Sequence, residues 1–151
     1  MDKICDRVYV SDAASAYRPE LLSSAGVTHV VSVGCARNED EAFARSVTCL
    51  ALPHVLDKPE TFVLPALQLC VRFVDAALAA DSSNIALVHC VYGQSRSISV
   101  VVAYLLARKG PAYTLRDALA HVRDVRQAAG RPISANPGFL AQLHLLQAAE
   151  G

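Results

Sequence analysis

One cysteine and one arginine in this sequence stand at a spacing that suits nucleophilic chemistry on a phosphate group. Arg96 lies six positions after Cys90, and Gly93 lies between them. A thiol becomes a good nucleophile when it is ionised, and a cation or a helix N-terminus beside it can lower its pKa from about 8.5 to between about 3.5 and about 7.5. Arg96 supplies the cation and a planar fork of donors for bidentate contact with phosphate. The pair therefore predicts an activated cysteine next to a phosphate clamp.

The residues around the pair predict a strand, a tight loop and a helix. Asn84 to Val88 is an apolar run typical of a strand buried on both faces, and Ser97 to Lys109 is a long, mostly apolar helical stretch. Backbone N–H groups of such a loop can converge on an anion at the helix N-terminus, and Gly93 can adopt the positive φ that the turn needs. The predicted phosphate-binding residues are Val91, Tyr92, Gly93, Gln94, Ser95 and Arg96.

Two neighbours of Cys90 have side chains that can support it. Ser97 can donate a hydrogen bond to the sulfur, and His89 can hold the loop from behind. In the plainer alternative, Cys90 packs as a small buried hydrophobe and Arg96 is a surface charge, as is common for these residue types. The strand, the glycine and the helix around the pair favour the functional interpretation.

The rest of the chain alternates short strands with helices. The strands are expected at Val8 to Val10, Thr28 to Val33, Val47 to Leu52 and Asn84 to Val88. The helices are expected at Arg18 to Ala25, about Pro65 to Ala80, Ser97 to Lys109, Thr114 to Ala128 and Pro137 to Ala149. This alternation predicts an α/β sandwich with a mostly parallel sheet, in which a site lies at the carboxyl ends of the strands.

Length and composition indicate one globular domain, residues 1–151. The 151 residues are 53% hydrophobic and 19% charged, which excludes intrinsic disorder. The 14 basic residues balance the 14 acidic ones, so no global field favours nucleic acid or an anionic membrane as a partner. The longest apolar run, Ile98 to Ala107, is shorter than the ~20 residues of a membrane-spanning helix.

The N-terminus and the cysteines indicate the compartment. Met1 to Arg7 contains no apolar signal region, so a cytoplasmic location is expected, with access to the nucleus left open. The five cysteines are odd in number, and no two of them have the spacing of a zinc or redox pair. We therefore expect no disulfide framework, no metal site and no cofactor.

The segment from His89 to Ser97 resembles the signature of the cysteine-dependent protein tyrosine phosphatase superfamily, which is His-Cys, five residues, Arg, then Ser or Thr. More narrowly, the chain is similar to the small, atypical dual-specificity phosphatases. The other segments that carry this likeness are Ile4 to Val10, Ala13 to Ala16, Leu21-Leu22, Gly26 to Val33, Val101 to Leu106, Arg131-Pro132, Asn136, Gly138-Phe139 and Gln142-Leu143. The resemblance implies one first strand over Ile4 to Val10. It also implies the cysteine phosphatase fold, a three-layer sandwich with a central, mostly parallel mixed sheet of about five strands flanked by helices.

The same resemblance implies roles for the residues of the signature. Cys90 would form a phosphocysteine intermediate, Arg96 would clamp the phosphate, and Ser97 would assist breakdown of the intermediate. The implied reaction is hydrolysis of phosphotyrosine and of phosphoserine or phosphothreonine in a phosphorylated protein, without a metal.

Residues outside the signature complete the implied site. In the family an upstream aspartate protonates the leaving oxygen and later activates water. Asp57, in the loop after a predicted strand, is our prediction for this residue, with Glu60 as the second choice. Asn136 matches an asparagine that ties down the active-site loops, although an N-cap role would explain it equally well.

Two alternative functions of the same fold bear on the substrate. A phosphoinositide or RNA 5′-phosphatase of the same fold is disfavoured, because positions 91–95 hold no lysine or histidine for extra phosphates. A catalytically weak, phosphoprotein-binding pseudophosphatase usually lacks the nucleophile that is present here.

The sequence departs from the family pattern in three places, which bear on the choice of substrate. Tyr92 stands where the family more often has a small residue, Ala135 replaces a common proline, and Gln127 to Gly130 lengthens the connection to Arg131.

Cys35 is expected on the rim of the site, where it could trap an oxidised Cys90 as a disulfide. The sequence indicates neither the oligomeric state nor the physiological substrate.

Overall fold

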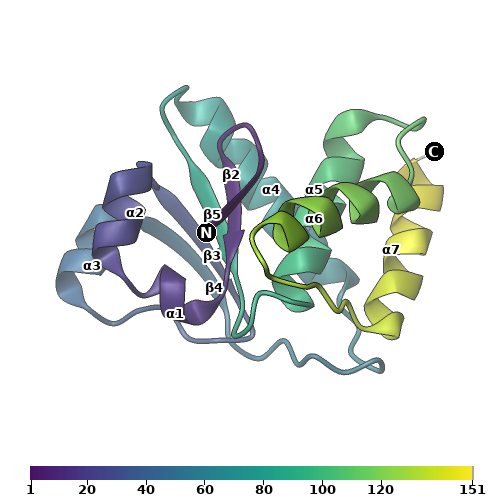
Figure 1. Cartoon of the computed structure of the whole chain (residues 1–151), viewed down its shortest axis with the longest axis horizontal. Coiled ribbons are helices and arrows are strands. Elements are labelled where there is room, and N and C mark those ends of the chain that lie inside the picture. Colours follow the sequence, from purple (N-terminus) through teal and green to yellow (C-terminus); the bar gives the residue numbers. More distant parts are fainter. Residues whose placement is uncertain (151) are drawn as a thin grey trace.

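The computed structural model of the chain describes residues 1–150 and contains a five-stranded sheet with helices on both faces (Figure 1). The strands are β1 (Asp2–Cys5), β2 (Val8–Ser11), β3 (His29–Val33), β4 (Thr48–Leu52) and β5 (Ala86–His89). The helices are α1 (Ala13–Ala16), α2 (Pro19–Ala25), α3 (Glu41–Ser46), α4 (Leu64–Ala80), α5 (Arg96–Lys109), α6 (Leu115–Ala128) and α7 (Pro137–Glu150). The strand order is β1-β2-β5-β3-β4, with β1 antiparallel to β2 and the other pairs parallel. The predicted fold class is confirmed.

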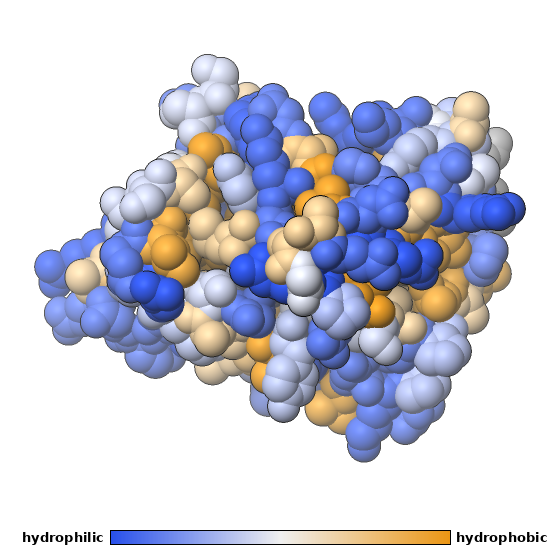
Figure 2. Space-filling view, in the orientation of Figure 1, coloured by the Kyte–Doolittle hydropathy of each residue, from blue (hydrophilic) through white to orange (hydrophobic). Residues whose placement is uncertain are grey.

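The two faces of the sheet carry separate hydrophobic cores. Helices α1, α2 and α3 cover one face, and α4 to α7 cover the other (Figure 1). Successive strand residues point to opposite faces, so Val30 and Leu87 pack into the first core while Val31 and Val88 pack into the second. Burial on both sides explains why these strands are almost wholly apolar. Hydrophilic side chains cover most of the face seen in Figure 2, with apolar side chains visible in patches between the elements.

Helix α5 is the central element of the second core. Every residue from Ser97 to Leu106 is buried, which explains the apolar run on all sides of this helix. Across residues 1–150, we find no helix with both the length and the apolar character needed to span a membrane.

Two segments differ from the sequence-based expectations. The prediction of one first strand over Ile4 to Val10 is wrong, because β1 and β2 form a hairpin with a turn at Asp6 and Arg7. Arg7 has φ 63°, and its side chain donates to three backbone carbonyls at the end of α4 and just after it. Helix α3 was not among the expected helices. Its N-cap is Asp40, whose carboxylate accepts from the N–H of Phe43.

The parallel strands bring four loops together at one edge of the sheet. Strands β2, β3, β4 and β5 all end at this edge, and β5 lies between β2 and β3. The loop after β5, residues 90–95, is therefore flanked by the segments that follow β2 and β3. This is the position at which α/β sheets build their sites.

Candidate active site

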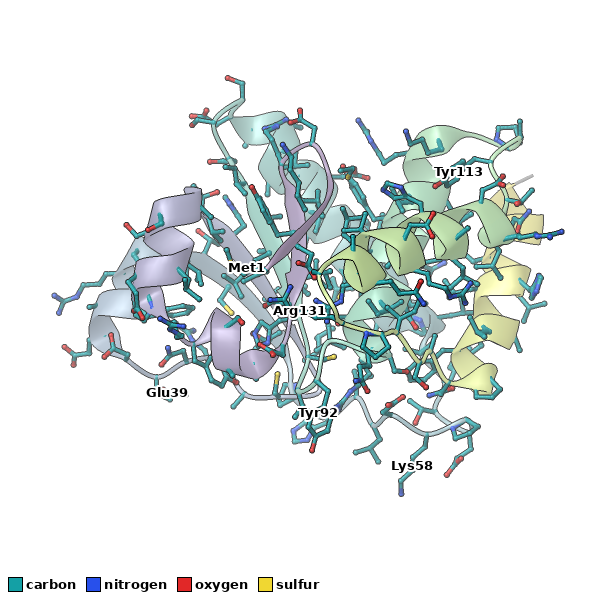
Figure 3. The ribbon with its side chains drawn as sticks, viewed as in Figure 1. Met1, Glu39, Lys58, Tyr92, Tyr113 and Arg131 are labelled. Carbon is teal, nitrogen blue, oxygen red and sulfur yellow. The ribbon has the colours of Figure 1, made fainter. Side chains whose placement is uncertain are left out.

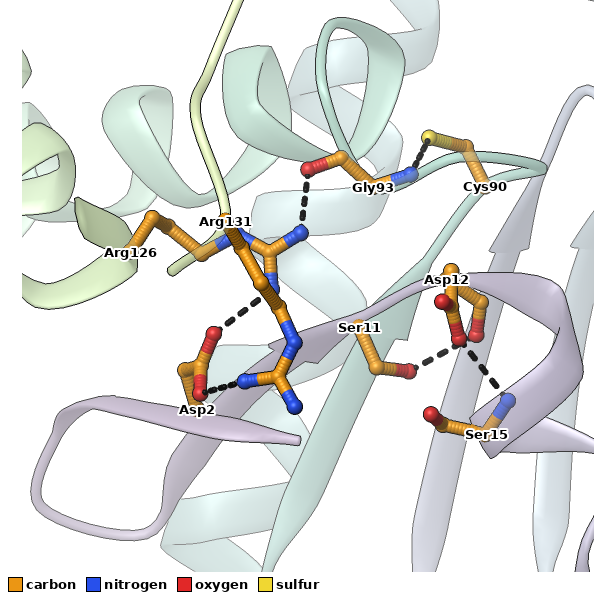
Figure 4. A network of polar contacts seen from close by, with 8 residues as sticks. All are labelled: Asp2, Ser11, Asp12, Ser15, Cys90, Gly93, Arg126 and Arg131. Carbon is orange, nitrogen blue, oxygen red and sulfur yellow. Dashed lines mark hydrogen bonds and ion pairs between the residues drawn. The ribbon is translucent and has the colours of Figure 1, made fainter. Parts of the chain in front are cut away.

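The loop between β5 and α5 is held open by contacts to its carbonyl groups. The carbonyl of Val91 accepts from the first N–H of α1 at 3.0 Å, and that of Gln94 accepts from the N–H of Ser134 at 2.9 Å. The carbonyl of Gly93 accepts from Arg126 Nη2 at 2.8 Å (Figure 4). The C=O and N–H of a trans peptide point in opposite directions, so these ties turn the N–H groups of the same peptides toward the centre of the loop. The result is a ring of donors, a shape that binds anions.

Cys90 lies at the base of this ring and is only 2% exposed. Its Sγ accepts from the N–H of Gly93 at 3.2 Å and lies 3.2 Å from the hydroxyl of Ser97. Burial by itself would raise the pKa of Cys90, but the hydrogen bonds from Ser97 and Gly93 and the charge of Arg96 together lower it. The site therefore favours the thiolate, which is the reactive form.

Arg96 is anchored by two carbonyls and keeps a donor free. Its Nη1 donates to the carbonyl of Gly34 at 3.2 Å and to that of Val55 at 3.1 Å. Its Nε is buried and finds no hydrogen-bond partner within residues 1–150. Gly34 has φ 74°, and a Cβ there would overlap the Arg96 guanidinium. A fixed guanidinium with a buried, unpaired N–H is suited to a phosphate oxygen.

The N-terminus of α5 is also left open for an anion. Ser95 occupies the N-cap position but makes no capping hydrogen bond. Its hydroxyl instead donates to Asp57 Oδ1 at 2.8 Å. The first N–H groups of α5 therefore keep their capacity to bind phosphate, and the helix dipole adds to it.

Asp57 is joined to the loop through Ser95 and Asn136. Its Oδ1 also accepts from Asn136 Nδ2 at 2.8 Å, while the N–H of Asn136 donates to the Ser95 hydroxyl at 3.0 Å. Asn136 Oδ1 accepts from the N–H of Phe139 at 2.9 Å, so this residue both caps α7 and ties the loops together. Asp57 itself is exposed. Glu60 is exposed as well, and the structure describes no contact from it to the loop.

His89 is buried and contacts the loop at the carbonyl of Cys90. Its Nδ1 is 3.3 Å from the carbonyl of Cys90, so Nδ1 carries the hydrogen and Nε2 accepts from the Ser32 hydroxyl at 2.7 Å. Burial lowers the pKa of His89, which favours the neutral form of the ring. Cys35 Sγ lies 3.7 Å from His89 Nδ1, at the border of the site.

Large apolar side chains are exposed around the site. Tyr92 is 74% exposed and projects from the same end of the molecule as Lys58 (Figure 3). Leu56 and Phe62, in the segment that carries Asp57, are 53% and 72% exposed. Tyr92 therefore points outward rather than lying across the ring.

Three contacts that hold the loop and Arg96 were not predicted from the sequence. The carbonyls of Gly34 and Val55 carry no sequence signal as acceptors, although a glycine directly after a strand at the carboxyl edge could have suggested close approach at Gly34. Arg126 lies 33 positions from Gly93, and no local pattern connects the two residues. Within residues 1–150 no group of three or more His, Cys, Asp or Glu side chains is arranged to hold a metal ion.

A hollow of about 440 Å³ lies at the other end of the strands, between the β1–β2 turn and the C-terminal parts of α4 and α5. The residues that line it include Cys5, Arg7, Asp75, Tyr104 and Arg108. It lies at the end of the sheet opposite Cys90, and the signature residues do not line it, so the ring at the carboxyl edge is the candidate site.

The comparisons with known proteins agree with this geometry. Residues 8–149 match the family model described as dual specificity phosphatase, catalytic domain. The chain belongs to this family. Dual specificity protein phosphatase 1 of Arabidopsis thaliana is 35% identical over 142 residues, which cover 93% of this chain and 65% of the relative. The chain thus spans less than two thirds of that relative's length.

Solved structures of family members are similar over nearly the whole chain. The crystal structure of DUSP15 has a TM-score of 0.85 at 26% identity and covers 99% of this chain and 88% of its own. The crystal structure of human DUSP28 has a TM-score of 0.84 at 29% identity and covers 99% of this chain and 96% of its own. The likeness to the small, atypical dual-specificity phosphatases is confirmed.

Proposed function

We propose that this member of the family is a protein phosphatase that hydrolyses phosphotyrosine and phosphoserine or phosphothreonine through a phosphocysteine intermediate, with the whole chain as one catalytic domain. The observation that carries the proposal is the ring itself. Cys90 Sγ lies at its base with a pKa that the charge of Arg96 helps to lower, and Arg96 Nε is buried with no hydrogen-bond partner within residues 1–150. These two side chains would supply the nucleophile and a phosphate donor, which supports the proposal.

In the first step the Cys90 thiolate attacks phosphorus. An S–P bond forms while the bond from phosphorus to the substrate oxygen breaks, and Asp57 donates a proton to that leaving oxygen. Charge on the transferring phosphoryl group is stabilised by Arg96 and the backbone N–H groups, which are already oriented. The products are a neutral alcohol or phenol side chain and phosphocysteine.

In the second step water attacks the phosphocysteine. The Asp57 carboxylate takes a proton from the water, the S–P bond breaks, and inorganic phosphate leaves. Ser97, whose hydroxyl lies 3.2 Å from Cys90 Sγ, stabilises the departing thiolate. The thiolate and the protonated Asp57 are restored for the next turnover.

A phosphorylated protein fits the surroundings of the ring better than a lipid headgroup or an RNA end. The exposed Tyr92, Leu56 and Phe62 offer apolar contacts to the residues that flank a phosphorylated side chain. The loop contributes no lysine or histidine for additional phosphates. We therefore infer that neither nucleic acid nor membrane is a partner.

The test measures hydrolysis of a small aryl phosphate and of phosphotyrosine and phosphothreonine peptides, with vanadate as a competing anion. Cys90→Ser should abolish turnover. Asp57→Asn keeps an acceptor for Ser95 and Asn136 but holds no acidic proton, so it should lower kcat by about 10²- to 10⁴-fold. Glu60→Gln is the matched control and should turn over like the wild type.

Three results would contradict the proposal. Turnover that persists in Cys90→Ser excludes the phosphocysteine route. Preference for a soluble phosphoinositide or an RNA 5′-triphosphate over both phosphopeptides excludes a protein substrate. An inactive wild type whose Cys90→Ser variant still binds the phosphopeptides would identify a phosphate-reading module.

A further inference from the structure

A buried arginine outside the signature contacts the catalytic loop. Arg126, near the end of α6, is 2% exposed. Its Nη2 donates to the carbonyl of Gly93 at 2.8 Å, and its Nη1 contacts Asp2 Oδ2 in β1 at 2.6 Å (Figure 4). Asp2 Oδ1 accepts from Arg131 Nη1 at 2.7 Å. One carboxylate at the start of the chain thus joins two guanidinium groups that are far from it in sequence.

The charges explain why Arg126 has a fixed position. A guanidinium cannot lose its proton, so a buried one requires a carboxylate partner. Asp2 supplies that partner and is itself 8% exposed. Because Asp2 fixes Nη1 and the group is planar, the direction of Nη2 is fixed as well. The loop carbonyl therefore meets a donor whose orientation is set from β1.

The contact is made at Gly93, which also donates to the sulfur of Cys90. Gly93 has φ 68°, and its own N–H donates to Cys90 Sγ at 3.2 Å. A Cβ on Gly93 would lie 2.7 Å from Arg126 Nη2 and 2.9 Å from the carbonyl oxygen of Ser11, so the loop rests directly on these groups. Holding the Gly93 carbonyl outward turns the N–H of the same peptide, that of Gln94, inward.

We propose that Arg126, oriented by Asp2, is a positioning residue that holds Gly93 so that the loop N–H groups face Cys90 and the bound phosphate. This inference rests on the proposed function of the ring. In this role, the side chain of Arg126 connects β1 to the catalytic loop.

Other contacts dock α6 against β1 without reaching the loop. The side chain of Arg131, just after α6, contacts Asp2, and its N–H donates to the carbonyl of Arg126 at 2.8 Å. His121 Nε2 lies 2.6 Å from the carbonyl of Ile4. If Arg126 served only to hold α6 on β1, removing Arg126 or Arg131 would affect stability alone. If Arg126 positions the loop, changing Arg126 must alter the anion-binding ring, and changing Arg131 must not.

Three variants separate these roles. Arg126→Lys keeps the charge but loses the fork that spans both partners. The double variant Asp2→Leu/Arg126→Met replaces the buried pair with apolar side chains, an exchange that proteins often accept without unfolding. Arg131→Gln is the matched control, because it removes a cation from Asp2 and leaves the contact from Arg126 to Gly93 in place. Circular dichroism and thermal unfolding first establish that each variant is folded.

Two readouts report on the ring without turnover. The pH dependence of alkylation of Cys90 by iodoacetamide, followed on its peptide by mass spectrometry, gives the pKa of the thiol. Calorimetric titration with tungstate, a phosphate-like anion, gives the affinity of the ring. In Arg126→Lys and in the double variant we expect a higher pKa for Cys90 and tungstate binding weakened about tenfold or more. Hydrolysis of the aryl phosphate should fall about 10²-fold in kcat/KM.

A folded double variant with the thiol pKa and tungstate affinity of the wild type would overturn the proposal. Equal effects from Arg131→Gln would also overturn it, because the effect would then belong to the packing of α6. A wild type that binds tungstate but does not hydrolyse phosphopeptides would refute the proposed function alone, since the alkylation and tungstate measurements still test Arg126.

Discussion

Activation of the nucleophile depends on groups that lie within seven positions of Cys90 in the sequence. Cys90 is almost fully buried, which disfavours a charge, yet its pKa is lowered because Ser97 and Gly93 donate to the sulfur and Arg96 lies nearby. Removing one donor should therefore be visible in the ionisation of the thiol.

Ser97→Ala is expected to raise the pKa of Cys90 and to slow breakdown of the phosphocysteine, since the departing thiolate loses a donor. A hydrogen bond to a charged group contributes about 1.5 to 3 kcal/mol, so turnover should fall about tenfold or more. Rapid-quench kinetics should show phosphoenzyme accumulating. Ser99→Ala is the control, because Ser99 is equally buried in α5 but donates to the carbonyl of Ser95. An unchanged pKa of Cys90 in Ser97→Ala would remove Ser97 from this role.

Cys35 has a location that suits reaction with an oxidised Cys90, although the disulfide stays a prediction. Its Sγ lies 3.7 Å from His89 Nδ1, in the residue directly before Cys90. Burial raises the pKa of the Cys35 thiol, so the Cys90 thiolate should be oxidised first and Cys35 should attack it. After peroxide treatment, a non-reducing gel should show a faster-migrating band that is lost in Cys35→Ser. The same band in that variant would exclude the pairing.

At the level of elements, the sequence predicted the structural features that residues close together in the chain determine. The strand, loop and helix around Cys90 were predicted because the apolar strand and the apolar helix border the loop directly. The start of α6 was predicted at Thr114, where a capping box with Asp117, three residues on, forms both of its hydrogen bonds. The hydrogen bond from Arg126 to Gly93 was not predicted, because the two residues come together only when α6 packs on β1.

Two shorter elements show where sequence patterns are weak. Of the hairpin, the residue pattern predicted only the strand at Val8 to Val10, which is β2. The turn that separates β1 from it was missed, because a strand of four residues carries too little alternation to be recognised. Helix α3, with six residues, is too short for a periodic pattern, although Asp40 is an N-cap residue type that could have indicated its start.

The start of α7 determines where the Asp57 loop can lie. A Cβ on Gly138 would overlap the carbonyl of Pro59, two residues after Asp57. Gly138→Ala should therefore push the loop away from Ser95 and weaken general-acid catalysis, with kcat/KM about 10²-fold lower. The loss should be greater for substrates with poor leaving groups, which depend most on protonation.

Two further variants test that steric argument. Asp57→Asn/Gly138→Ala should show no loss beyond Asp57→Asn, because both changes remove the same function. Gly110→Ala adds a methyl group that no atom beyond the neighbouring residues approaches within 4 Å, but φ 87° strains an alanine there. This variant should therefore lose some stability and keep its turnover. Additive losses in the double variant would show that Gly138 acts elsewhere.

For the whole molecule, the ring is held by segments from every part of the chain. The N-terminal strand acts through Asp2, α1 binds the carbonyl of Val91, and residues 134–136 bind Gln94 and Ser95. His89 joins this arrangement to β3 through Ser32. Because His89 is buried and contacts both Ser32 and the carbonyl of Cys90, the stability of the fold and the geometry of the ring are coupled through this residue.

This coupling makes stability depend on pH through His89. Burial lowers the pKa of His89 below its ordinary value of 6.5, so in the unfolded chain the ring gains a proton as pH falls through about 6.5, while in the folded chain it stays neutral to lower pH. The unfolded state then binds more protons, and the free energy of unfolding decreases as pH falls through this window. His29, whose pKa burial also lowers, contributes in the same direction.

Urea unfolding under reducing conditions at pH 7 and pH 5 measures this dependence. Wild type should lose stability toward pH 5, and His89→Gln, whose amide oxygen can accept from Ser32, should lose less. The exposed His144 provides the control, because His144→Gln changes the same residue type without disturbing a buried contact. An equal loss in wild type and His89→Gln would show that another group carries the pH dependence, with His29→Gln as the next variant to compare.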